Sequence, residues 1–269
     1  MKVKDLLLIP SKVSQRDKQL LLAHLLKVKP PELYLRMDQE VPEAFVEEYW
    51  KGLSKLEEGY PLQYLLGEWD FYGRTFKVKE GILIPRPETE LLVEKTLELL
   101  DKHKEYVGLE IGVGSGCIAI TLLLERENLF MYGTDINPDA LEISWSNAQI
   151  HGVSRRLKLA QGKDFEPVRG MKFDFIVSNP PYIPESFWEE LPDALKLEGK
   201  ASLIGGEKGW EFYERFSKEA KNHLKVGGFF VLEIGHDQGE VVKDILREYK
   251  VKVFKDYSGQ DRVVVGWNF

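Results

Sequence analysis

The chain of 269 residues has very little cysteine: Cys117 is its only one. A lone cysteine cannot form an internal disulfide, so the chain is not a small secreted scaffold held by cross-links. Its place, where a glycine-rich stretch enters a helix-like segment, favours a small buried packing residue over a reactive thiol. The histidines show no metal-ligand spacing with one another or with the cysteine, so no metal is expected.

Long apolar runs and an excess of positive charge are also missing. No apolar stretch reaches the roughly 20 residues of a membrane span, and residues 1–10 are too short for a secretory signal. A cytoplasmic protein without membrane contact is therefore expected. The formal net charge of −7 argues against broad adhesion to DNA or RNA, so no direct nucleic-acid binding is expected. The charged fraction of 30% and the few Met and Cys hint at a heat-adapted source.

The most informative stretch that is present is Asn179-Pro180-Pro181-Tyr182, which follows the apolar run 173–178. Two prolines remove main-chain donors, while the Asn179 side-chain oxygen and the Pro180 carbonyl remain as acceptors. Such a site suits a planar amino group: the acceptors hold its two hydrogens, and the ring of Tyr182 stacks on it. These four residues are the predicted catalytic and substrate-binding set, although asparagine also serves as a plain strand-end cap.

A candidate cofactor site lies upstream. The apolar run 107–111 breaks into a glycine-rich loop at residues 112–116 and then enters a helix-like segment at 117–124. A second strand, residues 130–136, carries Asp135 near its end, about twenty positions after the loop. A carboxylate at this place accepts hydrogen bonds from ribose hydroxyls, so the two features together predict a nucleotide-like cofactor.

The competing interpretation is a dinucleotide site, marked by G-x-G-x-x-G. Here the pattern is G-x-G-x-G, Cys117 stands where the third glycine would be, and no P-loop lysine is present. The loop therefore resembles motif I of class I methyltransferases, which bind S-adenosylmethionine, and the sulfonium methyl of that cofactor is an electrophile. The cofactor-binding residues expected from this resemblance are Glu110, Gly112, Val113, Gly114, Ser115, Gly116, Asp135, Ile136, Asp164, Phe165 and Asn179. Some relatives place an aromatic residue opposite the adenine where this chain has Asp164, so either the neighbouring Phe165 fills that role or neither residue does.

The chain divides into three predicted parts. Residues 1–67 contain a capping pattern, Ser14-x-x-Asp17, and a second helical pattern that opens at Pro42, which predicts a small helical bundle. Residues 68–86 predict a β-hairpin linker. Residues 87–269 alternate strands with helices, which predicts a mostly parallel sheet covered on both faces. The later elements are expected as strands at 157–161, 173–178, 229–235, 251–257 and 262–267 and helices at 138–151, 209–224 and 238–249.

Over nearly its whole length the chain resembles the HemK/PrmC glutamine methyltransferases, which modify class 1 peptide chain release factors. The matching segments are residues 61–67, 84–90, 110–116, 179–183, 203–209, 232–239 and 256–263. The resemblance implies an α/β class I methyltransferase fold: a Rossmann-like, mostly parallel seven-stranded sheet with an antiparallel last strand. It further implies transfer of a methyl group from S-adenosylmethionine to the glutamine of a Gly-Gly-Gln loop, with S-adenosylhomocysteine as product. Residues 1–67 would then recognise the release factor, and Arg86, Pro87 and Glu88 would join the substrate site.

Three alternatives stay open at this stage. An adenine N6-methyltransferase acting on DNA or RNA uses the same acceptor logic, but the acidic balance disfavours its basic recognition surface. An oxidoreductase is disfavoured by the glycine spacing. A noncatalytic binding protein is disfavoured by the intact Asn179-Pro180-Pro181-Tyr182.

Overall fold

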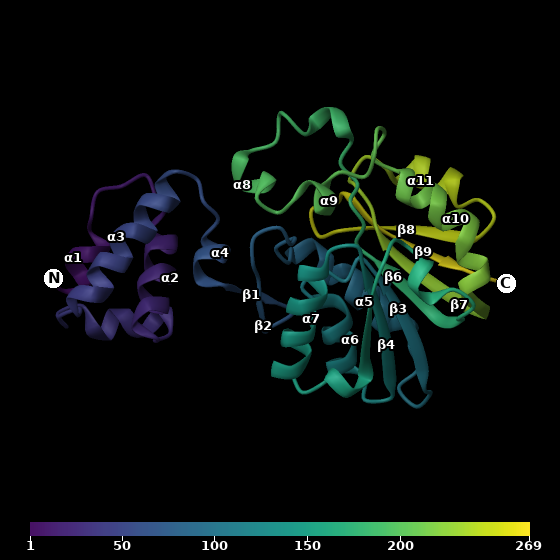
Figure 1. The fold of residues 1–269 in the computed structure, drawn as a ribbon, viewed down its shortest axis with the longest axis horizontal. Helices are drawn as coiled ribbons and strands as arrows, with labels where there is room; N and C mark the ends of the chain where they lie inside the picture. Colours follow the sequence, from purple (N-terminus) through teal and green to yellow (C-terminus); the bar gives the residue numbers. More distant parts are fainter. The chain divides into compact units, whose positions relative to one another are not determined.

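The computed structural model describes residues 1–269, which form two compact units, Met1–Glu68 and Trp69–Phe269. The first unit is helical (Figure 1). Its second helix begins where the capping pattern predicts, because the Ser14 hydroxyl accepts the Asp17 N–H at 3.1 Å. The elements of this unit are α1 (Val3–Leu7), α2 (Gln15–Leu26), η1 (Pro30–Arg36), α3 (Glu43–Glu57) and α4 (Leu62–Leu66).

The second unit is built on one seven-stranded sheet, entered through a hairpin of β1 (Glu68–Phe71) and β2 (Arg74–Lys77). The strand order is β5-β4-β3-β6-β7-β9-β8, and β9 alone runs opposite to the other six strands. This confirms the predicted fold class. The strands are β3 (Tyr106–Ile111), β4 (Leu129–Asp135), β5 (Leu157–Gln161), β6 (Phe173–Ser178), β7 (Leu224–Glu233), β8 (Lys250–Lys255) and β9 (Asp261–Trp267).

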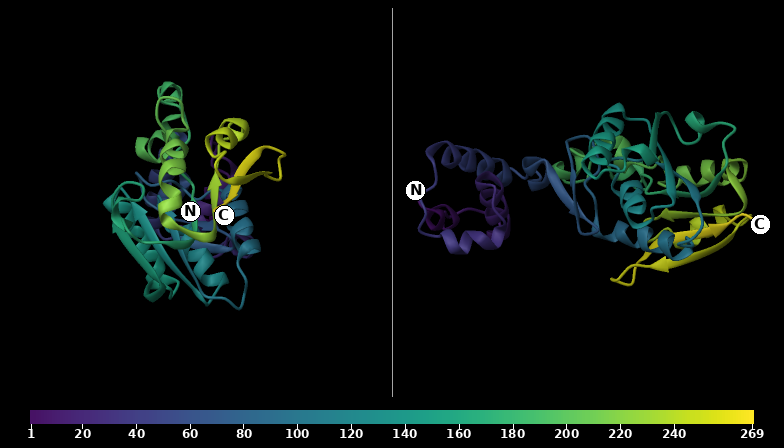
Figure 2. Two further views of the ribbon diagram at one scale, coloured as in Figure 1. Left: turned by 90° about the vertical axis from the view of Figure 1, so that its right-hand side faces the viewer. Right: turned by 90° about the horizontal axis from the view of Figure 1, so that it is seen from below.

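Helices cover both faces of the sheet (Figures 1 and 2). One apolar core joins α5 (Glu90–Leu99), α6 (Cys117–Glu125) and α7 (Pro138–Ile150) to strand residues such as Phe175 and Val231. The other core joins α10 (Glu211–His223) and α11 (Gly239–Ile245) to Ile176 and Phe230. Neighbouring residues along a strand thus enter opposite cores, as the pleat requires. The remaining short elements are η2 (Pro87–Thr89), η3 (Ser154–Arg156), η4 (Glu166–Val168), η5 (Glu185–Phe187), α8 (Asp193–Lys196) and α9 (Lys200–Leu203).

Two predicted boundaries are wrong by four residues or more, and the ends of several other elements differ by one or two residues. Strand β7 begins at Leu224 rather than at residue 229, because the Gly227-Gly228 pair lies inside the strand, beside an irregularity in the β6–β7 register. Helix α11 ends at Ile245 rather than at residue 249, so the chain turns before β8 starts at Lys250. None of the helices combines the length and the apolar character that a membrane crossing requires.

The order of the strands positions the site. The chain leaves β3 toward β4 on one side, whereas β6 lies on the other side of β3. In such a sheet the loops after the two central strands diverge and leave a crevice at their carboxyl ends. The glycine-rich loop after β3, Asp135 at the end of β4 and Asn179 after β6 all belong to this edge of the sheet.

Candidate active site

A cavity of about 320 Å³ opens at this edge of the sheet. It is lined by most of the residues that the sequence singled out, which lie at or after the ends of four strands and in the segment before α5. The predicted residues that line it are Arg86, Glu110, Gly112, Val113, Gly114, Ser115, Asp135, Ile136, Asp164, Asn179, Pro180 and Pro181. Predicted residues outside its lining are Pro87, Glu88, Gly116, Phe165 and Tyr182.

Main-chain N–H groups of the glycine-rich loop donate their hydrogen bonds within the protein. Gly112 donates its N–H to the Thr134 carbonyl at 2.8 Å, and Gly114 donates to Asp135 Oδ2 at 3.0 Å. Gly116, with φ of 82°, donates back into the loop and starts α6 in a conformation that side chains rarely adopt. A loop whose amides are used in this way does not form the phosphate cradle of a dinucleotide site.

Glu110 reinforces this distinction. Its side chain is buried, and Oε2 accepts the N–H of Ala119 in the first turn of α6 at 2.9 Å. Burial raises the pKa of Glu110, and the nearby charge of Asp135 raises it further. Dinucleotide folds place a pyrophosphate at this helix start, but here a carboxylate occupies it. The cavity therefore favours a cationic ligand, and the sulfonium and ammonium groups of S-adenosylmethionine fit these residues.

Asp135 is held rigidly at the end of β4. Its Oδ1 accepts the N–H of Asn137 at 2.9 Å, and its Oδ2 accepts the N–H of Gly114 at 3.0 Å. Burial raises its pKa. Each carboxylate oxygen has a second lone pair, so a carboxylate in this environment can still accept hydrogen bonds from hydroxyl groups. The next residue, Ile136, adds an exposed apolar side chain to the cavity wall.

Asp164 and Phe165 lie in different environments. Asp164 lines the cavity, and its Oδ2 accepts from Arg215 Nε at 2.5 Å. Phe165 is 1% exposed and stacks on the ring of His223, with ring centroids 4.4 Å apart. Its ring therefore belongs to the core. The Phe165 ring thus does not line the cavity, and cofactor binding by Asp164 or Phe165 stays a prediction.

Asn179 presents an acceptor to the cavity. Its Nδ2 donates to Thr89 Oγ1 at 3.3 Å, whereas its Oδ1 has no hydrogen-bond partner within the protein. The Pro180 carbonyl next to it is likewise unpartnered. Because the amide nitrogen faces Thr89, the two free oxygens are left for a ligand that brings two hydrogens.

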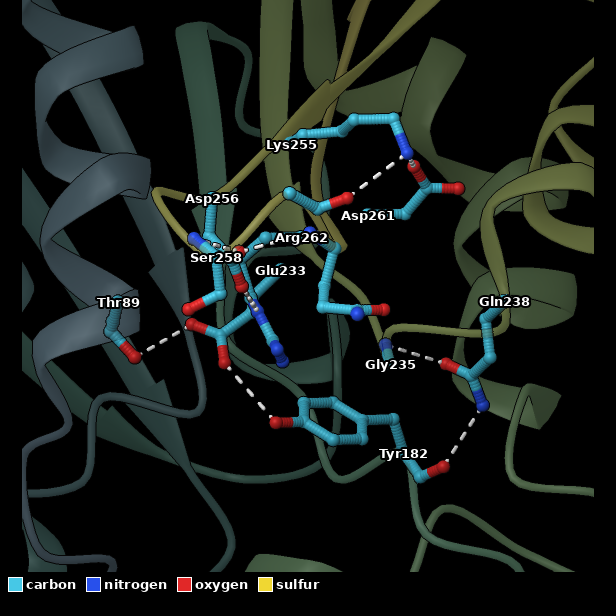
Figure 3. Close-up of polar contacts among 12 residues, drawn as sticks. Thr89, Tyr182, Glu233, Gly235, Gln238, Lys255, Asp256, Ser258, Asp261 and Arg262 are labelled. Carbon is cyan, nitrogen blue, oxygen red and sulfur yellow. Dashed lines mark hydrogen bonds and ion pairs between the residues drawn. The ribbon is translucent and has the colours of Figure 1, made fainter.

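Tyr182 lies outside the cavity lining. Its side chain turns away from the cavity, and the hydroxyl donates to Glu233 Oε1 at 3.3 Å (Figure 3). Burial and the charge of Glu233 raise the pKa of Tyr182 well above its usual value, so the phenol is protonated. Stacking of Tyr182 on a substrate amide stays a prediction.

Arg86 lines the cavity, but its guanidinium is engaged by the protein. It forms an ion pair with the buried Glu198 and also donates to the Ile84 carbonyl at 3.0 Å. Glu198 accepts the N–H of Ile84 at 3.1 Å as well. Pro87 and Glu88 are exposed. No group of three or more His, Cys, Asp or Glu side chains is placed to hold a metal ion.

Sequence reasoning missed three buried polar residues around this site: Thr89, Glu198 and Glu233. Glu233 ends the apolar strand β7, just as Glu110 and Asp135 stand near the ends of β3 and β4. An acidic residue at the end of a buried parallel strand is a usable signal, because such ends meet at one edge of the sheet. Thr89 and Glu198 have no comparable signal.

Comparison with solved structures supports the fold. The crystal structure of a methyltransferase from Pyrococcus furiosus superposes with a TM-score of 0.54 and 22% identity, covering 73% of this chain and 89% of that chain. At this level of identity the likeness concerns the fold alone.

Sequence comparison is more specific. The PrmC N-terminal domain family matches residues 10–67, and the methyltransferase small domain family matches residues 87–190. The release factor glutamine methyltransferase of Aquifex aeolicus (strain VF5) is 54% identical over 266 residues, which cover 98% of this chain and 95% of the relative. That of Moorella thermoacetica is 37% identical over 255 residues, covering 93% and 90%. The family expected from the motifs is thereby confirmed, and the chain belongs to the release factor glutamine methyltransferases.

Proposed function

We propose that the chain transfers a methyl group from S-adenosylmethionine to the side-chain amide nitrogen of the glutamine in the Gly-Gly-Gln motif of class 1 release factors. The observation that carries this proposal is the pair of unpartnered oxygens, Asn179 Oδ1 and the Pro180 carbonyl, beside a cavity with buried carboxylates. The names of the relatives supply the substrate class.

The acceptors explain how an unreactive amide nitrogen is oriented. When bound, S-adenosylmethionine supplies an electrophilic methyl group. Asn179 Oδ1 and the Pro180 carbonyl accept the two hydrogens of the substrate amide, which directs the nitrogen toward that methyl group. The same two dipoles stabilise the positive charge that develops on nitrogen during transfer. The proton leaves the product nitrogen for water after transfer, so no strong base is needed at this position.

The cofactor would be held by groups of the cavity wall. Glu110 and the loop at Gly112–Gly116 would hold its methionine part, since a buried carboxylate favours the cationic end. Asp135 would accept from the ribose hydroxyls. Ile136, which follows it and is 52% exposed, would offer an apolar surface to the adenine.

The helical unit would recognise the release factor away from its glutamine loop. Support comes from apolar side chains that this unit exposes, Leu35 at 88% and Leu8 at 74%. Leu35→Asp in the full chain should raise the KM for the release factor and leave the methylation rate of a free Gly-Gly-Gln peptide unchanged. Equal loss with both substrates would argue against the recognition role.

The main test is transfer of labelled methyl from S-adenosylmethionine to a purified release factor. The same release factor with its loop glutamine replaced, and unmethylated DNA, serve as comparison substrates. Asn179→Ala should lower kcat about a hundredfold, while Asn128→Ala, at the opposite end of β4, should not change it. Labelling of the release factor whose loop glutamine is replaced would refute the substrate assignment. Labelling of DNA alone would instead favour the adenine methyltransferase alternative.

A further inference from the structure

Residues 232–239 and 256–263 match the family but have no role in the proposed function. These two segments meet at one buried carboxylate, Glu233. This side chain is 2% exposed at the end of β7. Its Oε2 accepts the Thr89 hydroxyl at 2.6 Å, and its Oε1 accepts the Tyr182 hydroxyl at 3.3 Å (Figure 3). Arg262, from the segment after the β8–β9 turn, lies beside it and donates to Asp256 at 3.1 Å.

The Thr89 arm of this network reaches the acceptor site. A hydroxyl has one hydrogen, and Thr89 gives it to Glu233 because an ionised carboxylate only accepts. The Thr89 oxygen is then left as an acceptor, and it takes the Nδ2 hydrogen of Asn179 at 3.3 Å. The direction of these two bonds fixes the side-chain amide with Oδ1 on the cavity side.

The Tyr182 arm fixes the other end of the same tetrapeptide. Glu233 holds the Tyr182 hydroxyl, and Gln238 Nε2 donates to the Tyr182 carbonyl at 2.9 Å. Gln238 is itself oriented, since its Oε1 accepts the Gly235 N–H at 2.9 Å. Residues at and just after the end of β7 thus hold Asn179 through Thr89 and hold Tyr182 directly. Figure 3 shows the Tyr182 end of this network.

Opposing effects of its surroundings determine the charge state of Glu233. Burial raises its pKa to about 7, against the hydrogen bond from Thr89 and the charge of Arg262, which lower it. Protonation would give the carboxyl a hydrogen to donate, and the Thr89 hydroxyl could then turn around. The titratable and charged groups that act on Glu233 from the surrounding elements are Glu88, Cys117, Tyr182, Tyr213 and Arg262.

We propose that Glu233 is a positioning residue, which acts through Thr89 to keep Asn179 Oδ1 turned toward the substrate amide. This inference rests on the proposed function for its catalytic consequence. When Glu233 is protonated or replaced by Gln, Thr89 can accept from it and donate to Asn179. The asparagine amide then turns over, and an NH₂ group faces the substrate hydrogens where an acceptor is needed.

The first test uses three threonine variants in the full chain. Thr89→Val removes the hydroxyl at nearly constant volume and should lower kcat for release-factor methylation at least tenfold, with the Kd for S-adenosylmethionine changed less than threefold. Thr89→Ser restores the hydroxyl and should recover kcat to within threefold. Thr96→Val is the matched control, because Thr96 is also fully buried, in α5, and bonds only the Leu92 carbonyl. A Thr89→Val enzyme that keeps wild-type kcat would overturn the inference.

A second test does not depend on any substrate. The side-chain NH₂ resonances of Asn179, followed by NMR in labelled protein, should titrate with a midpoint near pH 7 in wild type and stay flat in Glu233→Gln. Those of Asn128 should not move in either. If the chemical shifts of the Asn179 side-chain NH₂ group change neither with pH nor in Glu233→Gln, the positioning role is refuted. Wild-type protein that fails to methylate release factor, yet shows this titration, would instead refute the proposed function alone.

Discussion

Replacing Asn147 by leucine should strongly destabilise the second unit, because one buried amide joins three parts of its chain. Asn147, in α7, is 1% exposed. Its Oδ1 accepts the Lys77 N–H at 2.8 Å, and its Nδ2 donates to the Lys77 carbonyl at 3.1 Å and to the Ser115 carbonyl at 2.8 Å. The side chain therefore links β2, α7 and the glycine-rich loop.

The magnitude follows from the groups left without partners. Asn147→Leu leaves one donor and two acceptors without partners, the Ser115 carbonyl in a buried place and the Lys77 N–H and carbonyl in a partly buried one. Each such group costs about 1–3 kcal/mol when buried. The added apolar surface of leucine returns about 1–2 kcal/mol. We expect a net loss of about 3 kcal/mol in the free energy of unfolding, together with weaker binding of S-adenosylmethionine, since the Ser115 carbonyl loses its anchor.

Urea unfolding followed by tryptophan fluorescence would measure the loss, and isothermal titration calorimetry would measure cofactor affinity. Gln149→Leu is the control: it makes the same kind of change two residues later in α7, at an exposed position, and should alter stability by less than about 0.5 kcal/mol. A loss below about 1 kcal/mol for Asn147→Leu would show that its three hydrogen bonds are not needed.

Three further predictions concern the carboxylates and the thiol. The pKa of Glu233 is raised to about 7, so the folded state binds the extra proton between the unfolded value and pH 7; its contribution to stability is present at low pH and is lost as pH rises through that window. The free energy of unfolding measured from pH 5 to 7 should therefore fall more steeply in wild type than in Glu233→Gln, by about 1 kcal/mol per pH unit, and equal slopes would contradict this. Asp135→Asn should weaken S-adenosylmethionine binding about tenfold in calorimetry, because the amide places donors where ribose hydroxyls need an acceptor; unchanged affinity would remove Asp135 from the ribose site. Burial raises the pKa of Cys117 to about 12, so iodoacetamide should label it in urea but not in the native protein, and fast native labelling would argue for an exposed thiolate.

Local pattern predicted the sheet well where strands are short and bounded by turns. Residues 157–161 and 173–178 were expected as strands, and β5 and β6 have these bounds. The glycine pair before residue 229 misled the prediction, because glycine marks a turn and a strand irregularity equally well. Which of these it forms is decided by pairing with β6, a contact between residues far apart in the sequence.

The candidate site could likewise be predicted only in part. Glu110, Asp135 and Asn179 could be predicted, because each lies at or near the end of an apolar strand and carries its own chemical signal. The side-chain directions of Phe165 and Tyr182 could not, since the core and Glu233 take up these rings. Thr89 was hidden because its importance lies in a partner 144 positions away, Glu233, with which it shares no local pattern.

The order of the last strands has a consequence for how the chain is made. β8 precedes β9 along the chain, yet β9 lies between β7 and β8 and is the only strand that β8 pairs with. During synthesis, β8 therefore stays unpaired until residues 261–267 have left the ribosome and can insert beside β7. The same insertion pairs Val263 with Glu233 and brings Arg262 to the carboxylate. A ribosome stalled before β9 would thus hold a chain whose cofactor loop is already made but whose Glu233 still lacks the charge of Arg262 beside it.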